Sequence, residues 1–182
     1  MRDPHFDKLP FQVRATPKII IENDWNTNAY ITFLLAIDTG LDVLGLVGST
    51  ANSWSRQASL HALALLEIGN LSCIPVHKGA DYPLLNSADL ARTWETLHGQ
   101  LPYQGVFKPF NATAEASGRD SSSGDPNRIS RPAFLEGFPN STLTGEHSAA
   151  WMVEQVRKHP GEVIVYSGGS LTNIALATRL DP

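Results

Sequence analysis

Apolar residues in this chain form short β-branched runs and longer stretches with helical spacing, and the two kinds alternate. Continuous apolar runs predict strands buried on both faces at 18–24, 43–47, from 74 onward, and at 162–166. Apolar residues at helical spacing predict helices over 29–37, 55–68 and 146–158, and a last helix that ends at residue 180. Strands and helices that alternate through short connections predict an α/β fold, with an open, mostly parallel sheet and helices on both faces.

Asp24 stands where the first predicted strand ends, just before a predicted helix. In open α/β sheets, ligands bind outside the carboxyl ends of the strands. A carboxylate there can bind a metal ion, act as a general base or cap the next helix, a role for which Thr27 is also suited. The pattern alone leaves these three roles of Asp24 open.

Composition and charge narrow the class of protein. The chain has 182 residues, of which 42% are hydrophobic and 18% charged, as expected for one soluble globular domain. A formal charge of -4, with Lys and Arg scattered, argues against nucleic acid or an anionic membrane as the partner. The chain has no apolar stretch of membrane-spanning length and no secretory signal at its start, so we expect a cytoplasmic protein.

Single residues with reactive side chains mostly have structural interpretations. Cys73 is the only cysteine, and its apolar neighbours predict an inert, buried thiol. His61 is expected to be a structural histidine within a helix, and Trp25 is expected to pack in the core. No two of the six histidines are spaced i, i+3 or i, i+4, so a zinc site is not expected.

Two segments do not fit the alternating pattern. Residues 1–16 are rich in Pro and charge and predict a flexible N-terminal arm. Residues 111–132 are rich in Ser, Gly and charge, which predicts either a disordered loop or a mobile lid.

Two motifs in this order resemble one known family. Residues 18–24, Lys-Ile-Ile-Ile-Glu-Asn-Asp, are similar to the opening strand of the inosine/uridine-preferring nucleoside hydrolases, which continues as D-x-D-P-G-x-D-D. Residues 169–177, Gly-Ser-Leu-Thr-Asn-Ile-Ala-Leu-Ala, resemble the second family signature, G-P-L-T-N-x-A-x-A. Further similar segments follow the family's order and spacing at 61–69, 74–76, 79–84 and 159–163. The similarity runs from about residue 17 to residue 182, is weakest over 90–140, and looks closest to a fungal-like branch.

The resemblance implies a fold, a reaction and a cofactor. It implies a Rossmann-like core and hydrolysis of the N-glycosidic bond of a ribonucleoside, which gives ribose and free base. It also implies a bound Ca²⁺ that holds the attacking water, with an Asp as base, and a tendency to form homo-oligomers. Glycosyl cleavage passes through an oxocarbenium-like ion, so an activated water on one face of the sugar suits the chemistry.

The resemblance also assigns roles to individual residues. Asp24 matches the residue that is both metal ligand and base, and Thr172 matches the one whose backbone carbonyl binds the metal. Glu22 stands where the motif has its first Asp, on the same strand face as Asp24, and is a further candidate ligand. Asn28 and Asn52 are the candidate substrate-binding residues.

The chain departs from the family pattern in ways that affect function. The paired acids of the motif fall on Asn28 and Ala29, and the chain ends at Pro182, short of a full family domain. We therefore interpret residues 17–182 as a partial, truncated domain with a weakened calcium site. If the domain is partial, the strand at 162–166 is expected to have an uncovered edge that favours self-association. The alternative functions are a catalytically dead relative that binds a nucleoside or sugar, and an inactive fragment.

Overall fold

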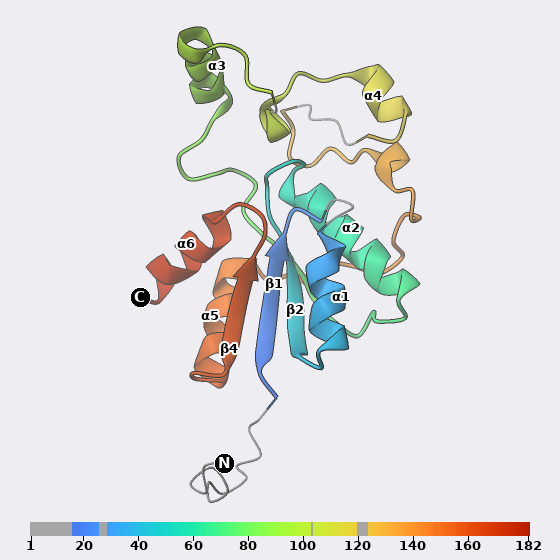
Figure 1. Ribbon diagram of the computed structural model, residues 1–182, viewed down its shortest axis with the longest axis vertical. Helices are drawn as coiled ribbons and strands as arrows, with labels where there is room; N and C mark the ends of the chain where they lie inside the picture. The colour runs from blue at the N-terminus through green and yellow to red at the C-terminus, as the bar shows by residue number, and fades with distance from the viewer. Residues whose placement is uncertain (1–15, 26–28, 103, 120–123) are drawn as a thin grey trace, which may run out of the picture.

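Four parallel strands form a single sheet at the centre of the protein (Figure 1). The computed structural model describes residues 16–25, 29–102, 104–119 and 124–182. The strand order is β3-β2-β1-β4, with these bounds: β1 Lys18–Asn23, β2 Asp42–Gly48, β3 Val76–Lys78 and β4 Val163–Ser167. Every strand pair is parallel, so the predicted parallel α/β sheet is confirmed.

Helices cover both faces of this sheet. Helices α1 (Tyr30–Asp38) and α2 (Ser55–Ile68) lie on one face, and α5 (Ser148–Lys158) and α6 (Thr172–Leu180) on the other (Figure 1). Side chains of β1 alternate between the two layers, because successive strand residues point to opposite faces. Ile19 and Ile21 belong to the hydrophobic cluster that includes α1 and α2, whereas Ile20 packs with residues of α5 and α6.

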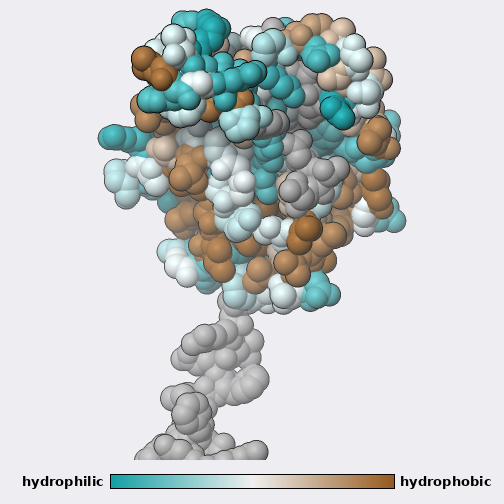
Figure 2. Space-filling model, turned by 45° about the horizontal axis from the view of Figure 1, so that its top comes forward, coloured by the Kyte–Doolittle hydropathy of each residue, from teal (hydrophilic) through white to brown (hydrophobic). Residues whose placement is uncertain are grey.

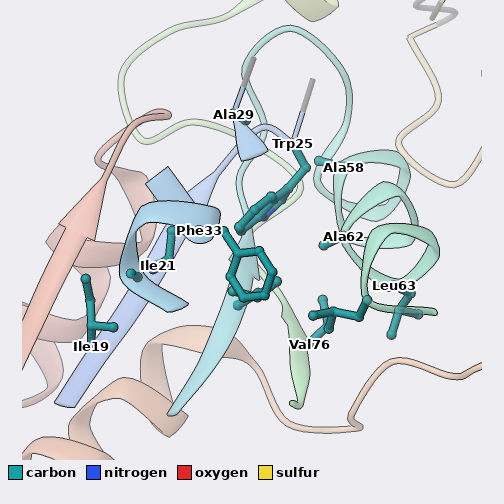
Figure 3. Close-up of a cluster of buried hydrophobic side chains, with 12 residues drawn as sticks. Ile19, Ile21, Trp25, Ala29, Phe33, Ala58, Ala62, Leu63 and Val76 are labelled. Atoms are coloured by element: carbon teal, nitrogen blue, oxygen red, sulfur yellow. The ribbon is translucent and has the colours of Figure 1, made fainter. Parts of the chain in front are cut away.

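Trp25 is fully buried in the cluster beneath α1 and α2, as Figure 3 shows. Its indole N–H donates to the carbonyl of Val47 at 2.7 Å, and its ring lies near that of Phe33. The backbone of Trp25 has a φ of 50°, a left-handed conformation that non-glycine residues adopt rarely. The prediction that Trp25 is a packing residue is therefore confirmed.

A layer of short elements lies above the carboxyl ends of the strands (Figure 1). It contains helix α3 (Ala88–His98), helix α4 (Ala112–Ala116), and the 3-10 turns Gly105–Phe107 and Arg131–Ala133. The pattern did not predict α3, which buries none of its residues; it is capped by Ser87, whose Oγ accepts from the N–H of Leu90. The described part of 111–132 is not wholly irregular, since α4 lies within it. Its role as a lid stays a prediction.

Several local predictions differ from the structure. Cys73 was wrongly predicted to be buried: it is exposed, because it lies in the turn that joins α2 to β3. Strand β3 begins at Val76 and not at Ile74, since Pro75 uses only its carbonyl, which accepts from Leu46. Thr27 and most of the expected N-terminal arm lie outside the described residues.

Strand β4 pairs only with β1 among the described residues, and its outer side is open to solvent. The apolar side chains Ile164, Val165 and Tyr166 of β4 are all partly exposed. Figure 2 shows hydrophobic residues gathered on the lower part of the body, whereas hydrophilic residues dominate the layer above it. No helix of the described residues is both long and apolar enough to cross a bilayer.

His77 of β3 is buried and stacks its ring on Trp151 of α5, with 4.0 Å between ring centroids. Its Nδ1 lies 2.8 Å from the hydroxyl of Thr144, and its Nε2 has no hydrogen-bond partner. Burial lowers the pKa of His77, although the carbonyl of Glu146 and the charge of Glu154 act in the opposite direction. The folded protein therefore favours the neutral ring.

We expect the contribution of His77 to stability to fall as the pH drops below about 6.5, because the unfolded chain then binds a proton at His77 that the folded chain does not. The loss contributed by this residue is at most about 1.4 kcal/mol per pH unit. Urea unfolding of the wild type and of His77→Phe, which keeps a stacking ring, at pH 7.5 and 5.5 measures it. Equal losses in the two proteins would remove His77 as the cause.

Candidate active site

Three connections meet where the strands β1, β2 and β4 end at their carboxyl sides. Asp24 follows β1 directly and is 8% exposed, so its predicted place at the end of this strand is confirmed. The N–H of Ser49, after β2, donates to the carbonyl of Asn23 at 2.9 Å. The N–H of Gly168, after β4, donates to the carbonyl of Glu22 at 2.9 Å. The sheet pairing thus continues into the loops that surround Asp24.

The turn at Gly168 and Gly169 packs against the end of β1 more closely than any side chain would allow. A Cβ atom on Gly169 would lie 2.1 Å from Oγ of Ser49 and 3.2 Å from the backbone nitrogen of Asp24. A Cβ atom on Gly168 would lie 2.7 Å from Nδ2 of Asn23. Both glycines are needed for this approach, which brings the start of α6 beside Asp24.

Glu22 is fully buried on the α6 side of β1. Its Oε1 accepts a 2.7 Å hydrogen bond from Nδ2 of Asn173, whereas its Oε2 has no partner of normal hydrogen-bond geometry, although the hydroxyl of Ser167 lies close enough to affect its pKa. Burial raises the pKa of Glu22 to about 7, and the amide of Asn173 and the nearby hydroxyl of Ser167 act in the opposite direction. A carboxyl group buried in this way readily binds a proton and becomes neutral, but it stays ionised if a cation lies beside it.

Other buried oxygens at these strand ends also have no hydrogen-bond partner. They are the hydroxyl oxygens of Ser49, Ser53, Ser167 and Ser170, in addition to Oε2 of Glu22. Buried polar atoms are nearly always satisfied, so each of these unsatisfied oxygens indicates room for a hydrogen-bond partner such as water.

The structure brings some of the predicted site residues together. Thr172 begins α6 and precedes Asn173, so its backbone lies at the same end of the sheet as Glu22 and Asp24. Asn52 is half-buried in the connection between β2 and α2, at this same end. Asn28 lies outside the described residues. Asn173 was not predicted as a site residue, although it lies within the second motif.

The oxygen donors at this site suit calcium in kind but provide little charge. Ca²⁺ binds hard oxygens from carboxylates, carbonyls and water. Glu22 and Asp24 would provide carboxylates, and Thr172 would provide a backbone carbonyl. Ala29, at a family acid position, has only a methyl group, and the described residues contain no group of three His, Cys, Asp or Glu side chains placed to hold a metal. The residues present therefore fit calcium chemically, with weak affinity expected.

The parallel sheet defines an open α/β domain, a class in which ligands bind outside the carboxyl ends of the strands. A sequence profile of the inosine-uridine preferring nucleoside hydrolases matches residues 19–182. The chain belongs to this family.

Individual relatives agree with this assignment. Probable uridine nucleosidase 2 of Arabidopsis thaliana is 32% identical over 168 residues, which are 91% of this chain and 42% of that protein. Uridine nucleosidase 1 of Arabidopsis thaliana is 30% identical over 166 residues, 90% of this chain and 40% of that protein. The chain spans about two-fifths of the length of these curated relatives.

Solved structures show the same fold. The plant nucleoside hydrolase PpNRh1 superposes with a TM-score of 0.64 at 21% identity, over 92% of this chain and 44% of that one. A purine-preferring ribonucleoside hydrolase from Gardnerella vaginalis gives a TM-score of 0.59 at 17% identity, over 91% and 44% of the two chains.

Proposed function

We propose that this site hydrolyses the N-glycosidic bond of a ribonucleoside and releases ribose and the free base. The observation that carries the proposal is the pair of buried carboxylates at the carboxyl end of β1, Glu22 within the strand and Asp24 directly after it, with one oxygen of Glu22 unsatisfied. The uridine nucleosidase relatives support a nucleoside as substrate.

Asp24 is the proposed base, because a carboxylate at this position can accept a proton from a water that attacks the sugar. Calcium, when bound by Asp24, Glu22 and the carbonyl of Thr172, supplies positive charge that makes water more acidic. Asn52 and Asn28 are proposed to bind ribose hydroxyls, since an amide both donates and accepts hydrogen bonds. Burial around Glu22 excludes bulk water, which strengthens each of these interactions.

A nucleosidase assay on the purified chain tests this proposal. We expect release of uracil from uridine, or of hypoxanthine from inosine, in the presence of Ca²⁺, and its loss when the ion is chelated. Chromatography of the products measures both. No release above the uncatalysed rate with either substrate would contradict the proposed reaction.

A second proposed function is binding of a nucleoside or sugar without catalysis. Ala29 favours it, because a methyl group replaces an acid of the family motif and lowers the charge available to a metal. Binding of labelled inosine in equilibrium dialysis, without release of base, would support this function over hydrolysis.

Homo-oligomer formation is also proposed, and the exposed apolar residues of β4 support it.

A further inference from the structure

Asn173 joins three separate parts of the protein through its side-chain amide. Its Nδ2 donates to Oε1 of Glu22 on β1 at 2.7 Å, and its Oδ1 accepts from the N–H of Ala80, after β3, at 2.8 Å. The residue itself belongs to the first turn of α6 and is 1% exposed. A buried amide with an acceptor on one side and a donor on the other has only one favourable orientation.

The loop at 79–81 provides a fixed reference for this amide. The hydroxyl of Thr50 lies 3.0 Å from the carbonyl oxygens of both Ala80 and Asp81, to which it donates. The N–H of Gly79 donates to Oγ of Ser55 at 2.9 Å. Because these bonds hold the loop, the N–H of Ala80 fixes Oδ1 of Asn173 and so directs Nδ2 toward Glu22.

Close packing removes the remaining freedom of the amide. A Cβ atom on Gly79 would lie 2.2 Å from Nδ2 and 2.6 Å from Oδ1 of Asn173. The amide therefore lies against the glycine backbone, where rotation would cause collision or break both hydrogen bonds.

We infer that Asn173 is a positioning residue for the nucleosidase site: it holds one oxygen of Glu22 and leaves the other free for a cation or water. The role given to the free oxygen rests on the proposed function. The orientation of the Glu22 carboxylate can be tested independently of that function. A purely structural role predicts that loss of Asn173 lowers stability and leaves the Glu22 carboxylate in place.

Crystal structures of the wild type and of Asn173→Ala test the orientation directly. We expect the Glu22 carboxylate to leave its wild-type position in the variant. In the double variant Glu22→Gln with Asn173→Asp, the donor and acceptor are exchanged, and we expect the wild-type geometry to return. Calorimetric titration with Ca²⁺ alone is the second measurement, and we expect Asn173→Ala to bind the ion roughly 10- to 100-fold more weakly.

Gln57→Leu is the matched control. Gln57 is also a buried amide with two hydrogen bonds to backbone groups. Its Oε1 accepts from the N–H of Ser130 at 3.0 Å, and its Nε2 donates to the carbonyl of Ser130 at 3.3 Å. It lies in α2, on the opposite face of the sheet from α6. We expect this variant to lose stability but to keep the position of Glu22 and the affinity for Ca²⁺.

The outcomes separate the two proposals. An unmoved Glu22 carboxylate in Asn173→Ala overturns the positioning role, even if the wild type binds calcium and releases base. If the wild type neither binds calcium nor releases base, but Asn173→Ala still displaces the Glu22 carboxylate, the positioning role is supported and the proposed function is contradicted. If Asn173→Ala does not fold, Gly79→Ala is the alternative variant, because its added methyl group displaces the Asn173 amide without removing it. The position of the Glu22 carboxylate in that variant is then interpreted in the same way.

Discussion

Asp24→Ala is expected to abolish calcium-dependent release of base from uridine or inosine. The variant loses both the proposed general base and a charged ligand, and general base catalysis alone contributes roughly 10²- to 10⁴-fold. Asp24 follows β1 at the point where β2 and β4 also end, so its loss leaves Glu22 as the remaining carboxylate of the proposed pair. Initial rates at saturating nucleoside, with and without Ca²⁺, measure the effect.

Two further variants make this result specific. Asp24→Asn keeps the size of the side chain and removes its charge, so it should lose activity to a similar degree. Asp38→Asn removes an exposed carboxylate at the end of α1 and should keep wild-type rates. If Asp24→Ala retains calcium-dependent release, Asp24 has no part in the mechanism.

Trp25→Ala is expected to lower the free energy of unfolding by about 3–5 kcal/mol, the usual cost of truncating a buried aromatic residue. The indole is fully buried, packs in the cluster under α1 and α2, and donates to the carbonyl of Val47. Removing it leaves a cavity and an unsatisfied backbone acceptor. This loss is a large part of the total stability of an ordinary domain.

Urea unfolding followed by circular dichroism measures this loss. Trp94→Ala is the matched control, because Trp94 lies on α3 and is 46% exposed, so its truncation should cost less than about 1 kcal/mol. Similar losses in the two variants would show that Trp25 does not support the core as its burial indicates. Since Trp25 follows Asp24 directly, we also expect its loss to weaken calcium binding.

The elements whose bounds were predicted well have both a regular pattern of apolar residues and a residue that ends the helix or strand. Helix α2 was predicted with the bounds that it has, because its apolar residues keep helical spacing up to Gly69. Helix α3 was missed, because none of its residues is fully buried and its few apolar positions therefore do not form a core-facing stripe. Cys73 was misjudged because apolar neighbours in a turn do not bury a side chain.

For the site, the sequence located the strand ends but not the contacts between them. Asp24 and Glu22 were found from the resemblance and the strand pattern, and both lie at the carboxyl end of β1. Asn173 was not found, because its importance depends on Ala80, 93 positions away in the sequence, and on Glu22, 151 positions away. The spacing of residues along one sequence does not indicate which distant residues pair in the fold.

Strand β1 is paired on both sides, with β2 and with β4, and its side chains alternate between the two helical layers. Inserting or deleting one residue within β1 would exchange the two faces, so that Ile21 or Asn23 would take the place of Glu22. Folding accuracy and chemistry therefore depend on the same ladder of backbone bonds. Variants in β2 or β4 that shift the register of this pairing are expected to abolish activity, although they change no residue that contacts the substrate.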